Sequence, residues 1–249
     1  MHYIVFDLEF NQDIPSLKNN SINKRKYPFE IIQIGAIKLD SNLNTRGTFN
    51  SYVKPKIYSQ VNPFITELTK ITTEQLEEEK FFPDVYKAFM KFIDDEECIF
   101  CIWGMSDIKE LFKNIHYHKL DNKRLSRSYI NIQPNVSKYL GLSSKKLLRL
   151  QSAVESLGIS KPYEFHNALY DAYYTAEIFK KIYYPSIKPK EYDPHYIKIR
   201  PKKRKEEIDY ESLIKQFDKM FGRKMSKGEE EIIKLAYKMG RTRQFVKQS

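Results

Sequence analysis

The chain has 249 residues, 41% of them hydrophobic and 14% aromatic, which is enough for one well-filled core and an appendage. No run of about 18 apolar residues is present, which excludes a membrane-spanning helix, and the N-terminus lacks a signal-peptide pattern. The net charge of +11 is uneven: residues 1–180 carry 24 Lys and Arg against 22 Asp and Glu, and residues 181–249 carry 19 against 10. A basic tail on a nearly neutral body predicts attraction to a polyanion, most often nucleic acid; a solvated tail without a ligand is the alternative.

The two cysteines, Cys98 and Cys101, lie three residues apart in the apolar run ECIFCIW. On a strand, residues three apart point to opposite faces, so the pair suits neither a shared metal ion nor a disulfide. No second CxxC or Cys/His cluster completes a zinc site. We therefore expect reduced core cysteines and a cytoplasmic protein.

Hydrophobic periodicity predicts an α/β domain with five strands and four helices. The strands are expected at residues 3–10, 30–39, 48–55, 98–103 and 127–132. The helices are expected at residues 84–93, 106–115, 144–156 and 167–182. Short connections favour antiparallel pairing of the first three strands, and the later alternation of helices and strands favours a mixed sheet.

The remainder of the chain differs in pattern from this first domain, which spans residues 1–182. Residues 183–205 are rich in proline and charge without a clear period, so we expect an extended basic linker. Two amphipathic stretches within residues 206–249, with a break marked by Gly222 and Ser226, predict a small helical C-terminal extension. Two such helices bury little surface alone, so they must dock or bind a partner.

Two carboxylates lie in the first predicted strand, within MHYIVFDLEF. Strand alternation puts Asp7 and Glu9 on one face and their apolar neighbours on the other. Paired carboxylates raise each other's pKa unless a cation lies between them, and such oxygen ligands suit Mg²⁺ or Mn²⁺. The alternative for so short a pattern is a solvent-facing polar edge.

A third carboxylate, Asp107, follows the predicted strand at 98–103 in the segment WGMSD. It falls in the first turn of a helix at the carboxyl end of a strand, where open α/β sheets gather ligands. An aspartate favoured only by the helix dipole is the alternative.

His166 and Asp171 lie five residues apart in EFHNALYDAYYTAEIF. If both were helical they would point about 140° apart and could not share a site. If the helix begins at Asn167 or Ala168, His166 lies on the preceding loop and can fold back toward Asp171. A row of alanines at 168, 172 and 176 fits close packing on a sheet, which would fix the direction of Asp171. An ordinary loop histidine beside a surface aspartate is the alternative.

In this order, DLE, the later aspartate and HNALYDA resemble the motifs of the DEDDh 3′–5′ exonucleases, the superfamily that includes RNase T and the proofreading subunit of DNA polymerase III. The chain is most similar to the ERI-type and KapD-type branch, over residues 1 to about 182, with EIIQIGAI and FITELTKIT in support and WGMSDIKEL replacing the commoner second motif. The resemblance implies an RNase H-like fold, a mixed five-stranded sheet flanked by helices. It also implies a metal-dependent enzyme that releases nucleoside 5′-monophosphates from the 3′ end of RNA or single-stranded DNA, with RNA favoured.

The resemblance further implies a role for individual residues of this chain. Two divalent ions, Mg²⁺ or Mn²⁺, would be held by Asp7, Glu9, Asp107 and Asp171. His166 would be the general base, and Glu9 counts among the catalytic residues as well as the ligands. The terminal nucleotide would contact Phe10, Leu68 and Trp103, although Trp103 is equally explained as a core residue.

The chain departs from the family pattern in a long basic insertion at residues 11–29, containing Lys24, Arg25 and Lys26, and in its tail. These departures leave the identity of the substrate open. Two alternative functions remain: a DNA proofreading or repair subunit, and a non-catalytic nucleic-acid-binding protein of the same fold. The presence of all four carboxylates together with His166 argues against the second. No membrane partner is expected, and the partner of the tail is unknown.

Overall fold

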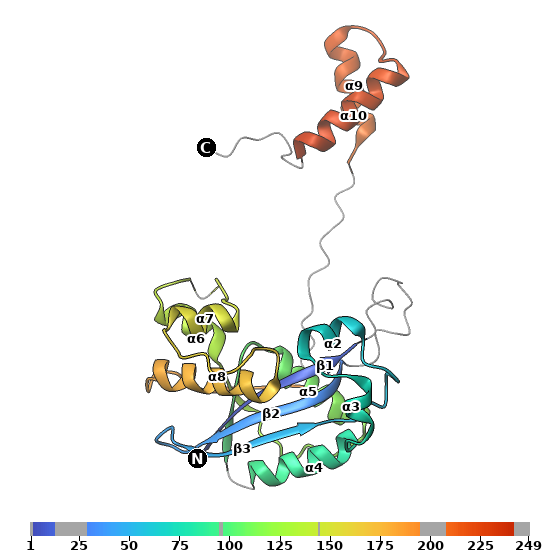
Figure 1. Cartoon of the computed structure of the whole chain (residues 1–249). Helices are drawn as coiled ribbons and strands as arrows, with labels where there is room; N and C mark the ends of the chain where they lie inside the picture. Colours follow the sequence, from blue (N-terminus) through green and yellow to red (C-terminus); the bar gives the residue numbers. More distant parts are fainter. Residues whose placement is uncertain (1, 13–28, 95–96, 144, 195–207, 242–249) are drawn as a thin grey trace. The chain divides into compact units, whose positions relative to one another are not determined.

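The computed structural model describes residues 2–12, 29–94, 97–143, 145–194 and 208–241 (Figure 1). The chain divides into two compact units, residues 1–196 and residues 197–249. Most of the predicted basic insertion and the later part of the predicted linker, residues 13–28 and 195–205, lie outside the described residues. Among the helices that are described, none is both long and apolar enough to span a bilayer.

Six strands form one mixed sheet in the first unit, in the order β3-β2-β1-β4-β5-β6. Their bounds are β1 (His2–Asn11), β2 (Glu30–Leu39), β3 (Thr45–Tyr52), β4 (Cys98–Ile102), β5 (Ser128–Asn131) and β6 (Lys190–Glu191). The central strand β1 pairs antiparallel with β2 and parallel with β4, and β6 runs antiparallel to β5. This is the mixed α/β sheet that the sequence predicts.

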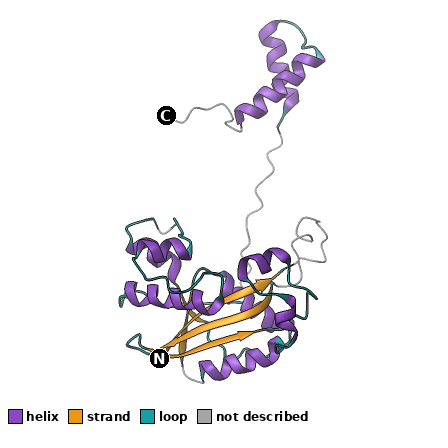
Figure 2. Ribbon diagram, viewed as in Figure 1, coloured by secondary structure: helices purple, strands orange, loops and turns teal. Residues whose placement is uncertain are grey.

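Helices pack against both faces of the sheet (Figure 2). On one face, α4 (Phe82–Ile93) and α5 (Ser106–Tyr117) share a core cluster with the even-numbered β1 residues Ile4, Phe6 and Leu8. On the other face, a second cluster joins Tyr3 and Val5 to α6 (Ile132–Tyr139), α7 (Leu150–Ser156) and α8 (Ala168–Ile182). Two shorter helices, α2 (Pro63–Thr69) and α3 (Thr73–Glu77), contribute Ile65 and Leu76 to a small third cluster. The central strand β1 is therefore covered by helices on both of its faces.

The sequence predicts the fold class correctly, but its count of five strands is wrong by one. The sixth strand, β6, lies in the segment expected to be linker, where Tyr192 packs its ring 5.0 Å from Phe112 and Ile187 is buried. A two-residue strand has no period to detect in a sequence, because its pairing is set by β5 rather than by its own pattern. Residues 183–194 therefore lie on the first unit.

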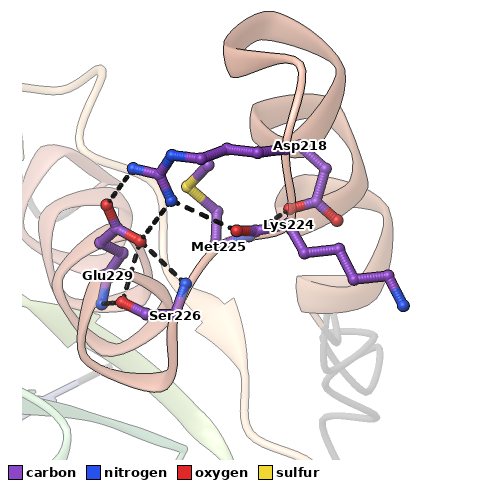
Figure 3. Close-up of polar contacts among 6 residues, drawn as sticks. Asp218, Lys224, Met225, Ser226 and Glu229 are labelled. Atoms are coloured by element: carbon purple, nitrogen blue, oxygen red, sulfur yellow. Dashed lines mark hydrogen bonds and ion pairs between the residues drawn. The ribbon is translucent and has the colours of Figure 1, made fainter.

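The second unit consists of two amphipathic helices, α9 (Tyr210–Phe221) and α10 (Lys227–Arg241). Gly222 ends α9 with a left-handed φ of 64°. Ser226 and Glu229 form a reciprocal cap at the start of α10, in which each donates its backbone N–H to the other's side chain (Figure 3). Arg223 adds a two-pronged ion pair to Glu229. The turn between the helices is thus well defined. Neither α9 nor α10 buries a side chain, and a partner for them stays a prediction.

Candidate active site

The register between β1 and β2 aligns the first two acidic residues with two unusual neighbours. Asp7 lies directly opposite Gly35, and Glu9 lies directly opposite Gln33. Residues opposite each other in an antiparallel pair project from the same face of the sheet. On this face, the odd-numbered residues of β1 point toward α8. The carboxylates of β1 and the start of α8 are therefore placed together by strand pairing.

Gly35 and Gln33 bring the first turn of α8 against the sheet. A β-carbon at Gly35 would lie 2.1 Å from the backbone carbon of Ala168, so only glycine permits this approach. Buried Gln33 accepts a hydrogen bond from the N–H of Ala168 at 3.1 Å and donates to Oδ1 of Asn167 at 3.3 Å. Asn167 in turn caps the helix by accepting from the N–H of Leu169 at 3.1 Å. These contacts fix where α8 begins and which way its first turn faces.

Three carboxylates converge where α8 meets β1. One oxygen each from Asp7, Glu9 and Asp171 lies within 4.8 Å of the others. Within the described part of the chain, Oδ1 of Asp171 is buried and accepts no hydrogen bond. A buried carboxylate oxygen without a donor is costly unless a cation is present. The donor set, all hard oxygens, fits a divalent cation such as Mg²⁺ or Mn²⁺.

The electrostatics of the cluster lead to the same conclusion. Burial, followed by repulsion from Asp107 and Glu9, raises the pKa of Asp7 well above its ordinary value. Burial and repulsion from Asp171 raise the pKa of Glu9 to about 8. Burial also raises the pKa of Asp171 to about 7, although its hydrogen bond from the backbone of His166 opposes the shift. A bound cation would reverse these shifts by stabilising the ionised forms.

Asp107 lies beside this group without being one of the three. It is buried in the first turn of α5, at 5% exposure, and burial followed by repulsion from Asp171 raises its pKa to about 7. β4 ends at Ile102 while β1 continues to Asn11, so the chain after β4 reaches the carboxyl half of β1. The predicted fourth carboxylate is thus at the same edge of the site, close enough to interact with Asp171.

His166 occupies the residue before the cap of α8, as the sequence predicts for a helix starting at Ala168. Its backbone is left-handed, with φ of 67°, and its N–H donates to Oδ2 of Asp171 at 3.2 Å. The imidazole is exposed, and partial desolvation lowers its pKa below the usual value. His166 is thus joined to the carboxylate cluster through its backbone, and it is not among the three clustered residues.

The three predicted nucleotide contacts lie in different surroundings. Phe10 is half-buried, with its ring 6.2 Å from that of Phe29. Leu68 is 38% exposed on α2, a helix that contacts β1. Trp103 is half-buried and packs against the core cluster beneath α8. Of the three, Leu68 is exposed, whereas Phe10 also packs against the core cluster on the α4 and α5 face of the sheet. The roles of all three residues stay predictions.

Sequence reasoning missed two residues that hold the loop and helix of this site, Gln33 and Tyr174. Gln33 is fully buried and bridges Asn50, Asn167 and Ala168. Its signal was available, since a lone amide inside the apolar run EIIQIGAI must find hydrogen-bond partners. The role of Tyr174 has no sequence signature. Its hydroxyl bonds to the backbone of Tyr163, on a loop whose course the sequence pattern does not predict.

Comparison with known proteins gives a consistent result. A model of the exonuclease family matches residues 4–179. The chain is 25% identical over 221 residues to the protein named Probable 3′–5′ exonuclease KapD of Bacillus subtilis, covering 86% of this chain and 96% of that one. It is 26% identical over 166 residues to 3′–5′ exoribonuclease 1 of Mus musculus, covering 63% of this chain and 47% of that one. The nuclease domain of 3′hExo, a DEDDh family member solved with rAMP, superposes with a TM-score of 0.61 at 22% identity, covering 72% of this chain and 90% of that one.

Proposed function

Because the chain belongs to the exonuclease family and shares the fold of its DEDDh members, we propose that it removes nucleoside 5′-monophosphates one at a time from the 3′-hydroxyl end of RNA. One observation carries the chemistry: oxygens of Asp7 and Glu9 on β1 and of Asp171 on α8 lie within 4.8 Å of one another. The buried Oδ1 of Asp171 within that group has no hydrogen-bond donor among the described residues. Several carboxylates buried this close together are unstable in their ionised forms unless a cation, such as a divalent metal ion, lies between them.

Asp7, Glu9, Asp107 and Asp171 would hold two divalent ions, Mg²⁺ or Mn²⁺. Such a pair, when bound, stabilises the charge on the attacking and leaving oxygens of an in-line phosphoryl displacement. The protein's contribution is rigidity. Asp7 and Glu9 are fixed by the central strand, and Asp171 is fixed by the contacts of Gly35 and Gln33 with α8.

His166 would act as the general base for the attacking water. Its ring is exposed toward solvent, and its lowered pKa keeps the imidazole neutral and able to accept a proton near pH 7. The hydrogen bond from the backbone N–H of His166 to Asp171 connects the proposed base to a proposed ligand of the same site. Proton acceptance and ligand placement thus depend on one short segment, residues 166–171.

The preference for RNA is supported by relatives rather than by the site itself. One of the similar proteins is named an exoribonuclease, and this chain spans about half of its length. The solved relative 3′hExo was crystallised with rAMP, a ribonucleotide. An enzyme distinguishes RNA from DNA at a given position by its contacts to the 2′-hydroxyl. Phe10, on the strand that carries Glu9, and Leu68, on a helix that contacts this strand, would contact that terminal nucleotide.

To test this proposal, the purified 249-residue chain is incubated with Mn²⁺ and with RNA and DNA oligonucleotides of the same sequence, each labelled at its 5′ end. We expect a ladder that shortens by single nucleotides from the 3′ end, release of nucleoside 5′-monophosphates, and faster degradation of RNA. EDTA and the substitution Asp171→Asn should each abolish the ladder. A 3′-phosphorylated oligonucleotide serves as the matched substrate control and should resist.

Three results would redirect the proposal. Faster degradation of single-stranded DNA would favour a proofreading or repair role. Binding of oligonucleotide without cleavage in any divalent metal would favour a non-catalytic binding protein. Cleavage that persists in EDTA would refute the metal-dependent mechanism.

A further inference from the structure

The loop before α8 is attached to that helix by a tyrosine hydroxyl. Tyr174 is fully buried, and its hydroxyl accepts a hydrogen bond from the N–H of Tyr163 at 2.9 Å. The same hydroxyl donates to the carbonyl oxygen of Tyr163. Both backbone polar groups of one loop residue are therefore satisfied by one side chain, three residues before His166.

Aromatic contacts reinforce this attachment. The ring of Tyr163 stacks on Tyr170, with centroids 4.4 Å apart and planes within 7°, and meets the edge of Tyr173 at 5.3 Å. The ring of Phe165 stacks on that of Tyr174 at 4.7 Å. We call these five residues, Tyr163, Phe165, Tyr170, Tyr173 and Tyr174, the tyrosine anchor. They join the loop to the outer surface and to the buried face of α8.

The backbone at His166 requires such an attachment. Its φ of 67° lies in the left-handed region, which non-glycine residues adopt only where the surroundings determine it. At His166 itself, the N–H donates a hydrogen bond to Oδ2 of Asp171. Asp171 and Tyr174 are three residues apart and lie on neighbouring positions of one helix surface. The loop is thus held by the same helix at Tyr163 and at His166 itself.

We propose that Tyr174 is a positioning residue of the active site, whose hydroxyl holds the loop so that His166 projects beside the carboxylate cluster. The inference rests on the proposed role of His166 as general base. Proton transfer requires the base within hydrogen-bond reach of the attacking water. A displacement of about 1 Å in such a site can lower the rate about 100-fold. Tyr174 touches no substrate and acts only through the loop.

The first test removes the hydroxyl and keeps the ring. Tyr174→Phe should lower kcat at least about tenfold and change KM by no more than about twofold, because the misplaced group acts in the chemical step and not in binding. Mn²⁺ affinity, measured by calorimetry, should be unchanged. Tyr183→Phe is the matched control: it removes a hydroxyl at the far end of α8 that is hydrogen-bonded to the hydroxyl of Tyr3 at 3.1 Å. It should leave kcat unchanged at a similar loss of thermal stability. If both variants lower kcat equally, Tyr174 has only a general structural role.

The second test asks whether Tyr174 acts through His166. If it does, the double variant Tyr174→Phe/His166→Ala should be no slower than His166→Ala alone, to within about twofold, since residues that act as one unit are non-additive. An additive loss in the double variant would mean that Tyr174 supports catalysis by another route, and would overturn the inference.

The third test does not depend on activity. Hydrogen exchange of the Tyr163 amide should be slow in the wild type and at least about tenfold faster in Tyr174→Phe, because the amide loses its acceptor. Equal exchange rates in the two proteins would show that the anchor does not hold the loop. If exchange accelerates while His166→Ala keeps full activity, the anchor exists but the proposed base is wrong, which separates the two failures.

Discussion

Gly35 of β2 lies directly against the backbone of Ala168, the first residue of α8. A β-carbon at Gly35 would stand 2.1 Å from the backbone carbon of Ala168 and from the backbone nitrogen of Leu169. Gly35 is also paired with Asp7 across the sheet. One missing side chain therefore sets the distance between the strand that carries Asp7 and the helix that carries Asp171.

The substitution Gly35→Ala tests this relationship. No contact of that length can persist, so the first turn of α8 must move away from the sheet, at a cost of about 1–3 kcal/mol in unfolding free energy. The displacement should also separate Asp171 from Asp7, weaken Mn²⁺ binding and lower kcat at least about tenfold. Thermal unfolding and calorimetry measure the two effects.

Gly47→Ala provides the matched control on the neighbouring strand β3. The nearest atom to a β-carbon at Gly47 is Cε2 of Phe92, at 3.4 Å, which is ordinary contact with a side chain. This variant should therefore keep metal affinity and kcat. If Gly35→Ala behaves like Gly47→Ala, the close approach of α8 is not what places Asp171.

A second prediction separates the proposed base from a proposed ligand. His166→Ala should lower kcat by about 10² to 10⁴, the usual contribution of general base catalysis, and leave Mn²⁺ affinity within a few-fold of wild type. Asp171→Asn should lower both, because the amide replaces a charged oxygen ligand. Titration calorimetry with single-turnover kinetics distinguishes the two patterns. The assignment of the pair fails if His166→Ala loses the metal as severely as Asp171→Asn.

How much of this arrangement the sequence predicts depends on how local each feature is. Strand alternation predicts the shared face of Asp7 and Glu9, and the cap at Asn167 predicts a helix that leaves His166 on a loop. Both depend on neighbours in the chain. The buried bridge formed by Gln33 joins segments 134 and 135 residues apart, and its partners emerge only when the sheet and α8 are assembled.

The same distinction explains β6 and the tyrosine anchor. β6 is two residues long and forms by pairing with β5. Its own sequence is too short to show the alternation that predicts a strand. Tyr174 looks like any core aromatic on an amphipathic helix until the course of the preceding loop is known. Contacts that depend on loop conformation carry little sequence signature, even where they surround a recognisable motif.

A third prediction concerns pH and the metal. In the metal-free protein, the pKa of Glu9 is raised to about 8 and those of Asp107 and Asp171 to about 7. A carboxyl group with a raised folded-state pKa stabilises the fold fully below its unfolded pKa, near 4, and that contribution disappears as the pH rises through the folded pKa. The metal-free protein should therefore lose stability from these groups between about pH 4 and pH 8. A divalent cation binds the ionised forms and offsets this destabilisation.

The difference in Tm between Mg²⁺-saturated and EDTA-treated protein should consequently grow from pH 5 to pH 8. Taking this difference at each pH cancels the titration of groups outside the site. Asp171→Asn removes one repelling charge and should flatten the dependence. A Tm difference that is constant over this range would show that the carboxylates are ionised without a metal.

The final prediction concerns the second unit, residues 197–249, which carries 16 Lys and Arg against 8 Asp and Glu. We expect this charge to strengthen nucleic-acid binding without affecting the chemical step. Deletion after residue 196, rather than after the sequence-predicted boundary at 182, keeps β6 and the buried Ile187 in the first unit. The truncated enzyme should keep its kcat and raise KM.

Its KM should also depend less on salt, because each phosphate of a single strand that the protein no longer neutralises lowers the slope of log K against log salt by about 0.7. Thermal unfolding of the truncated chain is the control that its core is intact. A dinucleotide substrate, which offers a single internucleotide phosphate for the second unit to neutralise, should be cleaved about equally by both forms. An unchanged salt slope with a long oligonucleotide would mean that α9 and α10 serve another partner. Their exposed apolar side chains, among them Ile232 and Leu235, would then point to a protein.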